Sequence, residues 1–255
     1  MKQNDQIPTI MAISAPSESD LDSLYYDCSN IGCGFVSKPR QDATDPESAI
    51  IRTTRLGRYN PRILWGAITW IRDNSDLVNP RKLEHRIPKG DPAVLGAMLD
   101  IALANGADKA LKHILPECKP KNERELLFQG FIGNPLHSQM SVEKALPEWL
   151  KWGLYCYEID FLKIMFDRER ILKHNKLLAI RAVVGPNVRA EILYYLYKNT
   201  RSYASELCRK IGFTYPTVYI ESQRMASNGF LSSERIGKTI LLSLAPKGRN
   251  LLAAI

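Results

Sequence analysis

The order of helix and turn signals over residues 187–255 constrains the fold of this chain more than any other feature. Apolar periodicity and glycine stops predict three successive helices, over residues 189–198, 203–211 and 215–228. Gly212 and Phe213 form a tight turn before the third helix. Thr214 is expected to cap that helix, and Pro216 is tolerated in its first turn.

A β-hairpin is predicted to follow the third helix. Two β-rich runs, 230–235 and 239–244, flank the turn Ile236-Gly237-Lys238, and residues 246–252 can then begin a closing helix. Helix, helix, turn, helix and hairpin is the order of elements in a winged helix-turn-helix.

Residues 187–255 resemble the winged-helix DNA-binding domains of bacterial and archaeal transcription regulators of the MarR and ArsR type. The resemblance is carried by four stretches: Ser205-Glu206-Leu207-Cys208-Arg209-Lys210-Ile211-Gly212, Thr214-Tyr215-Pro216-Thr217-Val218, Asn228-Gly229-Phe230-Leu231, and Leu244-Ala245-Pro246-Lys247-Gly248-Arg249. Two positions depart from the pattern. Ser222 stands where a core leucine is usual, and Ala245 stands where a capping Thr or Ser is usual.

The predicted third helix has the composition of a surface that contacts DNA. The major groove admits one α-helix, whose first turns present side chains to the base edges. These side chains would be Tyr215, Thr217, Tyr219 and Gln223, whereas Val218 and Met225 would face the core. Phosphate contacts are expected from basic side chains near the helix and at the hairpin: Arg209, Lys210, Arg224, Arg235 and Lys238.

The charge distribution agrees with a polyanionic partner. The chain has a formal net charge of +8. Residues 181–255 hold 11 basic and 4 acidic side chains, whereas residues 1–50 hold 3 basic and 8 acidic ones. Because residues 1–50 are also rich in polar residues and show no sustained period, we expect them to be largely irregular.

Residues 51–184 are predicted to form a helical domain for assembly or sensing, with a boundary at Gly185-Pro186. Three pairs of a capping residue and proline, Asn60-Pro61, Asn79-Pro80 and Asp91-Pro92, indicate helix starts. The helix after Asp91 is apolar nearly all round and should be buried. Further helices are expected over residues 108–115 and 147–174, and residues 126–132 could form a strand or a short helix.

Two features of this region have alternative interpretations. Arg52, Arg55, Arg58 and Arg62 could grip phosphates, but a solvated or acid-paired stretch is the favoured interpretation. The aromatic residues between Trp149 and Phe166 are typical of a core, and could also form an effector pocket or a dimer interface.

Several function classes lack support in the sequence. Cys28 and Cys33 resemble a nucleophile-cysteine loop, but no His or Asn follows at a matching spacing. There is no phosphate-binding loop, no serine elbow and no metal-ligand spacing. No apolar run approaches the roughly 18 residues of a membrane span. We therefore expect no enzymatic activity, no cofactor, no metal and no membrane partner.

The sequence thus predicts a mainly α-helical protein with an N-terminal helical domain and a C-terminal winged helix. It would be a cytoplasmic, sequence-specific transcription regulator that binds double-stranded DNA, with residues 215–228 in the major groove and residues 235–239 on the backbone. Because paired half-sites need paired helices, we expect a homodimer. A small-molecule effector or a protein partner stays open, as does the alternative of an adaptor or antitoxin-like subunit that does not read DNA.

Overall fold

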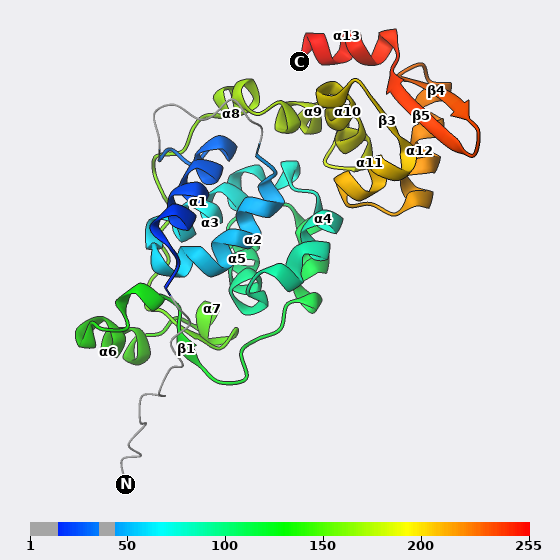
Figure 1. The fold of residues 1–255 in the computed structure, drawn as a ribbon. Coiled ribbons are helices and arrows are strands. Elements are labelled where there is room, and N and C mark those ends of the chain that lie inside the picture. Colours follow the sequence, from blue (N-terminus) through cyan, green and yellow to red (C-terminus); the bar gives the residue numbers. More distant parts are fainter. Residues whose placement is uncertain (1–14, 36–43) are drawn as a thin grey trace.

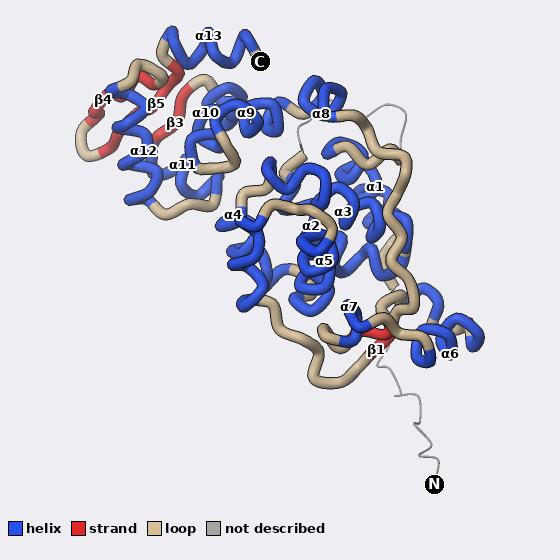
Figure 2. Tube along the Cα trace, turned by 180° about the vertical axis from the view of Figure 1, so that it is seen from behind, coloured by secondary structure: helices blue, strands red, loops and turns tan. Residues whose placement is uncertain are grey.

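The computed structural model describes residues 15–35 and 44–255, which fold around two hydrophobic cores (Figure 1). Helix α9 (Lys176–Val184) belongs to both, because Leu178 packs in the first core and Ile180 in the second. The change of core therefore falls a few residues before Gly185-Pro186, where the sequence predicts the boundary. As predicted, the fold is mainly helical, and its one antiparallel sheet within the described residues lies in the C-terminal part (Figure 2).

The N-terminal part is a helical assembly around a buried central helix, α5 (Pro92–Ala104), which packs against α2 (Pro46–Leu56) and α3 (Pro61–Asn74). A short parallel pair joins β1 (Glu125–Leu126) to β2 (Leu154–Tyr155). The other helices are α1 (Glu18–Ile31), α2 (Pro46–Leu56), α3 (Pro61–Asn74), α4 (Pro80–Arg86), α6 (Pro135–Glu143), α7 (Pro147–Leu150) and α8 (Arg168–His174). None of the described helices has both the length and the apolar character that a bilayer span requires.

The three predicted helix starts are confirmed. The side chain of Asn60 accepts a hydrogen bond from the backbone N–H of Arg62, and that of Asn79 accepts one from Lys82. Asp91 accepts from the N–H groups of two residues of α5. In each case proline occupies the first helical position, where its missing N–H leaves no bond unmade.

Two predictions about the N-terminal part are wrong. Residues 1–50 are not largely irregular where they are described, because α1 and the first turn of α2 fall within them; residues 1–14 and 36–43 lie outside the described residues. The long helix over residues 147–174 does not form. Its ends are the short helices α7 and α8, and Gly153 adopts a φ of +74° beside Lys121. The Trp149 indole donates to the carbonyl of Glu158, so tertiary contacts override the helical pattern.

Two further segments of the N-terminal part contain 3-10 helix. The helix predicted over residues 108–115 is a 3-10 helix, which spans residues 109–117 and continues through Pro116. Over residues 126–132, the end of β1 is followed by a single 3-10 turn at Gln129–Phe131. The 3-10 helix over residues 109–117 lies against α4 and α5, and the turn at Gln129–Phe131 lies against the 3-10 turn Gly57–Tyr59. These tertiary contacts hold short turns whose own hydrogen-bond geometry is poor.

Arginines at positions 52 and 58 are paired with acids, as the favoured interpretation predicts. Arg58 is buried, donates to the carbonyls of Leu126 and Leu127, and pairs with Asp91 and Glu125. Arg52 pairs with Asp27. Arg55 and Arg62 are exposed. The four side chains therefore form no continuous basic surface.

A buried network of ion pairs fastens the two parts together. Arg181 of α9 is completely buried, and its Nη1 lies 2.7 Å from Oε1 of Glu47 in α2. It also donates to Glu191 of α10 (Val188–Asn199) and to the carbonyl of Leu77. Lys82 of α4 completes the network, with its Nζ 2.8 Å from Glu191 and 3.0 Å from Asp45. Burial raises the pKa of Glu47 to about 7, although Arg181 opposes this shift.

The C-terminal part follows the predicted order of elements. It comprises α10 (Val188–Asn199), β3 (Arg201–Tyr203), α11 (Ala204–Ile211), α12 (Tyr215–Ser227), β4 (Leu231–Ile236), β5 (Thr239–Leu244) and α13 (Pro246–Ala254). The strand β3 is absent from the prediction, which assigns no element to residues 199–202 between two of the predicted helices. It pairs with β5, so the sheet has the antiparallel order β3-β5-β4.

Candidate nucleic-acid interface

Helix α12 and the β4–β5 hairpin lie side by side at the end of the molecule farthest from the N-terminal helices (Figure 1). Helix α11 precedes α12 and ends at Gly212, whose left-handed φ of +76° reverses the chain. Val218 and Met225 are buried on the inner face of α12, as predicted. The hydroxyl of Ser222 is buried without a hydrogen-bond partner among the described residues, at the position where the resemblance expects leucine.

The start of α12 differs in one detail from the prediction. Thr214 occupies the N-cap position, but its side chain makes no capping bond to the backbone. Its hydroxyl instead lies 2.8 Å from the hydroxyl of Thr217. Thr217 is half-buried, and its hydroxyl is engaged by this contact.

Tyr215 and Tyr219 present aromatic rings to solvent from the first two turns of α12. Their exposed fractions are 47% and 39%, so none of the other described residues covers them. The two rings stack on each other with centroids 6.0 Å apart. Residues four apart are neighbours on a helix surface, and stacking restricts both side chains to one arrangement.

Gln223 lies farther along α12, where the helix meets the hairpin. Its Nε2 is 3.5 Å from the hydroxyl of Ser233 in β4, at the limit of a hydrogen bond. The contact places the amide between the two elements that the sequence assigns to base and backbone contacts. A bidentate approach to adenine would require this weak bond to break.

Four predicted phosphate contacts are exposed basic side chains. Arg209 and Lys210 belong to the last turn of α11, Arg235 lies near the end of β4, and Lys238 lies in the hairpin turn. No ion pair engages any of them within residues 15–35 and 44–255. Strand alternation places the neighbouring acid, Glu234, on the opposite face of the hairpin from Arg235.

The fifth predicted contact, Arg224, is held by an acid that sequence reasoning missed. Glu221 lies 2.6 Å from Nη1 of Arg224 and 2.7 Å from Nε of Arg189. The hydrogen bond from Arg189, followed by that from Arg224, lowers the pKa of Glu221. Helical spacing could have indicated the Glu221–Arg224 pair, but the contact with α10 is tertiary.

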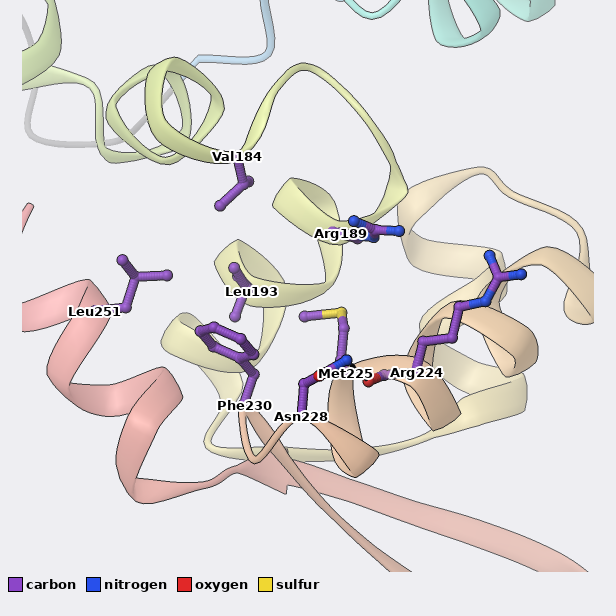
Figure 3. A pocket seen from close by; sticks show the side chains of 8 residues that line it. All are labelled: Val184, Arg189, Leu193, Arg224, Met225, Asn228, Phe230 and Leu251. Atoms are coloured by element: carbon purple, nitrogen blue, oxygen red, sulfur yellow. Dashed lines mark hydrogen bonds between the residues drawn. The ribbon is translucent and has the colours of Figure 1, made fainter.

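A pocket lies behind the C-terminal half of α12 (Figure 3). Its volume is about 380 Å³. Apolar side chains line one side, and the guanidinium groups of Arg189 and Arg224 project at the other. The lining residues come from α9, α10, α12, α13 and the start of the hairpin: Val184, Arg189, Leu193, Arg224, Met225, Asn228, Phe230 and Leu251. Movement of α12 against α13 would therefore change its shape.

Comparison with known proteins gives limited similarity. No known protein family matches the sequence. Protein PAC2 of Saccharomyces cerevisiae is 26% identical over 99 residues, which are 38% of this chain and 18% of that protein. The chain thus spans less than one fifth of the length of this relative.

Proposed function

We propose that residues 188–254 form a winged helix-turn-helix and that the protein is a sequence-specific, DNA-binding transcription regulator. The support for the fold is the order of α10, α11, α12 and the β4–β5 hairpin, with β3 completing a small antiparallel sheet. In this assignment α12 is the recognition helix and the hairpin is the wing.

One observation carries the proposal: the first turns of α12 are open to solvent and have exposed cations on both sides. Arg209 and Lys210 lie at the end of α11, and Arg235 and Lys238 lie on the hairpin. A duplex carries a dense line of phosphates on both sides of its major groove, so this distribution matches a helix inserted there. Tyr215, Thr217, Tyr219 and Gln223 would then contact base edges or nearby phosphates.

The N-terminal part would supply assembly or sensing in a cytoplasmic homodimer.

A second candidate function, an adaptor that binds a protein, is favoured by an apolar patch far from α12. Phe131, Ile132, Leu136 and Val142, around α6, are all more than a third exposed. Exposed apolar patches of this kind are typical of protein interfaces.

The direct test is selection of fragments from the native genome, followed by titration of the selected duplexes at several salt concentrations. We expect selective binding. The logarithm of the association constant should fall linearly with the logarithm of salt concentration, because contacts to phosphates release counterions. Absence of duplex binding at low salt would reject the regulator and favour the adaptor.

Single substitutions should separate the wing from the recognition helix. Lys238→Ala should weaken binding to all duplexes alike and reduce the salt slope by about 1, because it removes one phosphate contact. Thr217→Ala should change the preference at one or two base positions, because it removes the methyl group that would contact a thymine methyl. The measurement is affinity for a panel of single-base variants of the selected duplex. Identical profiles for the two variants would show the assignment of helix and wing to be wrong.

Removal of the acid on α12 should strengthen DNA binding. Glu221→Gln releases Arg224, so we expect affinity to rise several-fold at low salt and the salt slope to steepen by up to about 1. Glu234→Gln is the matched control, since it removes the same charge from the opposite face of the hairpin. Equal gains in the two variants would mean that only net charge matters and that Arg224 makes no specific contact.

A further inference from the structure

Ile220 occupies the centre of the outward face of α12. Each residue turns an α-helix by about 100°, so Ile220 lies about 200° around the axis from the buried Val218. It is 48% exposed, more than Tyr219 beside it. The sequence prediction names residues on both sides of it but omits Ile220 itself.

The charges around Ile220 are complementary to those of a polyanion. The neighbouring acid, Glu221, is neutralised by Arg189 and Arg224. Next to α12, helix α11 carries the exposed Arg209 and Lys210, and the hairpin carries the exposed Arg235 and Lys238. An apolar side chain with basic residues around it complements a duplex, in which the groove floor lies between two lines of phosphates.

The chemistry of isoleucine limits what it can recognise in that groove. Its side chain has no donor or acceptor, so it can distinguish bases only by apolar contact. The C5 methyl group of thymine is the apolar group that a base pair presents in the major groove. Gln223, three residues later on the same face, can pair with adenine, so adjacent A·T pairs would satisfy both side chains.

We propose that Ile220 is a specificity-determining residue that contacts a thymine C5 methyl group in the major groove of the bound duplex. This inference rests on the proposed function and adds to it a base, an atom and a side chain. It also explains why an isoleucine is exposed at the most outward position of α12.

The test combines a change in the protein with the removal of one methyl group from the DNA. Each thymine of the duplex selected by the wild-type protein is replaced in turn by deoxyuridine, which lacks only the C5 methyl. We expect one or two positions at which this replacement weakens wild-type binding about fourfold, the effect of one apolar methyl contact. At the same positions, the replacement should have no effect on Ile220→Ala.

Ile164→Ala is the matched control, because Ile164 is also exposed but lies in the N-terminal part. It should retain the full sensitivity to deoxyuridine. Thermal melting checks that Ile220→Ala is folded, and Ile220→Val should retain part of the sensitivity.

The outcomes separate this inference from the proposed function. If no duplex is selected, both fail. If duplexes bind but Ile220→Ala remains as sensitive to deoxyuridine as the wild type, DNA binding stands and the contact with thymine is rejected. Loss of sensitivity in the Ile164→Ala control would also overturn the assignment to Ile220.

Discussion

Replacement of Arg181 by methionine should lower the free energy of unfolding by about 3–5 kcal/mol. The side chain is completely buried and is the bridge between Glu47 and Glu191. Methionine fills much of the same space but leaves two carboxylates in a site without solvent. Lys82 still pairs with Glu191, so Glu47 should account for most of the loss. The measurement is chemical or thermal unfolding of the full chain.

The pH dependence of this variant has a definite sign. Burial already raises the pKa of Glu47 to about 7, above its usual value of 4.5, and Arg181 opposes the shift. Without Arg181, the pKa of Glu47 in the folded protein should rise further. A group with a raised folded pKa contributes stability at low pH and loses it as pH rises. The loss of unfolding free energy in Arg181→Met, relative to the wild type, should therefore be smaller at pH 5 than at pH 8.

Arg168→Met provides the matched control. Arg168 pairs with Asp76 at 2.6 Å, but both side chains are more than 40% exposed. Exposed ion pairs contribute about 0–1 kcal/mol to the free energy of unfolding, so the stability of this variant should be close to that of the wild type. If the two variants had equal stability, the network would not be what fastens the C-terminal part to the N-terminal part.

Simultaneous replacement of Arg209, Lys210, Arg235 and Lys238 by alanine should reduce duplex affinity by at least about a hundredfold at low salt. Each lost phosphate contact lowers the salt slope by about 0.9, so the four together should lower it by about 3.6. All four side chains are exposed, so the fold should persist.

The control for this variant carries the same change in net charge at another place. Lys109, Lys112, Lys144 and Lys163 are exposed lysines of the N-terminal part. Their replacement by alanine should leave most of the affinity intact. An equal loss in both variants would mean that binding depends on overall charge and that α12 and the hairpin are not the contact surface.

Local signals predicted the parts of the fold that local chemistry determines. A capping side chain followed by proline acts within one turn, and the three pairs singled out in the sequence, Asn60-Pro61, Asn79-Pro80 and Asp91-Pro92, each begin a helix. The order of elements after Asn187 was predicted for the same reason, since turns and apolar periods are short-range patterns. The strand β3 was not predicted, because its pairing with β5 joins residues about 40 positions apart.

Long-range packing decided the features that were missed. The aromatic residues after Trp149 suggested a helix, but Trp149 packs edge-on against Trp65, and its indole N–H bonds to a nearby carbonyl. Likewise, the sequence indicated which residues of α12 could face DNA but could not show that Glu221 holds Arg224. Helical geometry alone would have indicated Ile220, had its apolar character not suggested the core.

Protection of guanine N7 from dimethyl sulfate tests most directly whether α12 enters the major groove. N7 lies on the major-groove edge of guanine, so a helix seated there shields it from methylation. On duplexes selected from the genome, the wild-type protein should protect N7 at discrete guanines at low salt, and the protein lacking the four cations should not. Duplex binding that leaves every guanine N7 reactive would contradict the placement of α12 in the major groove.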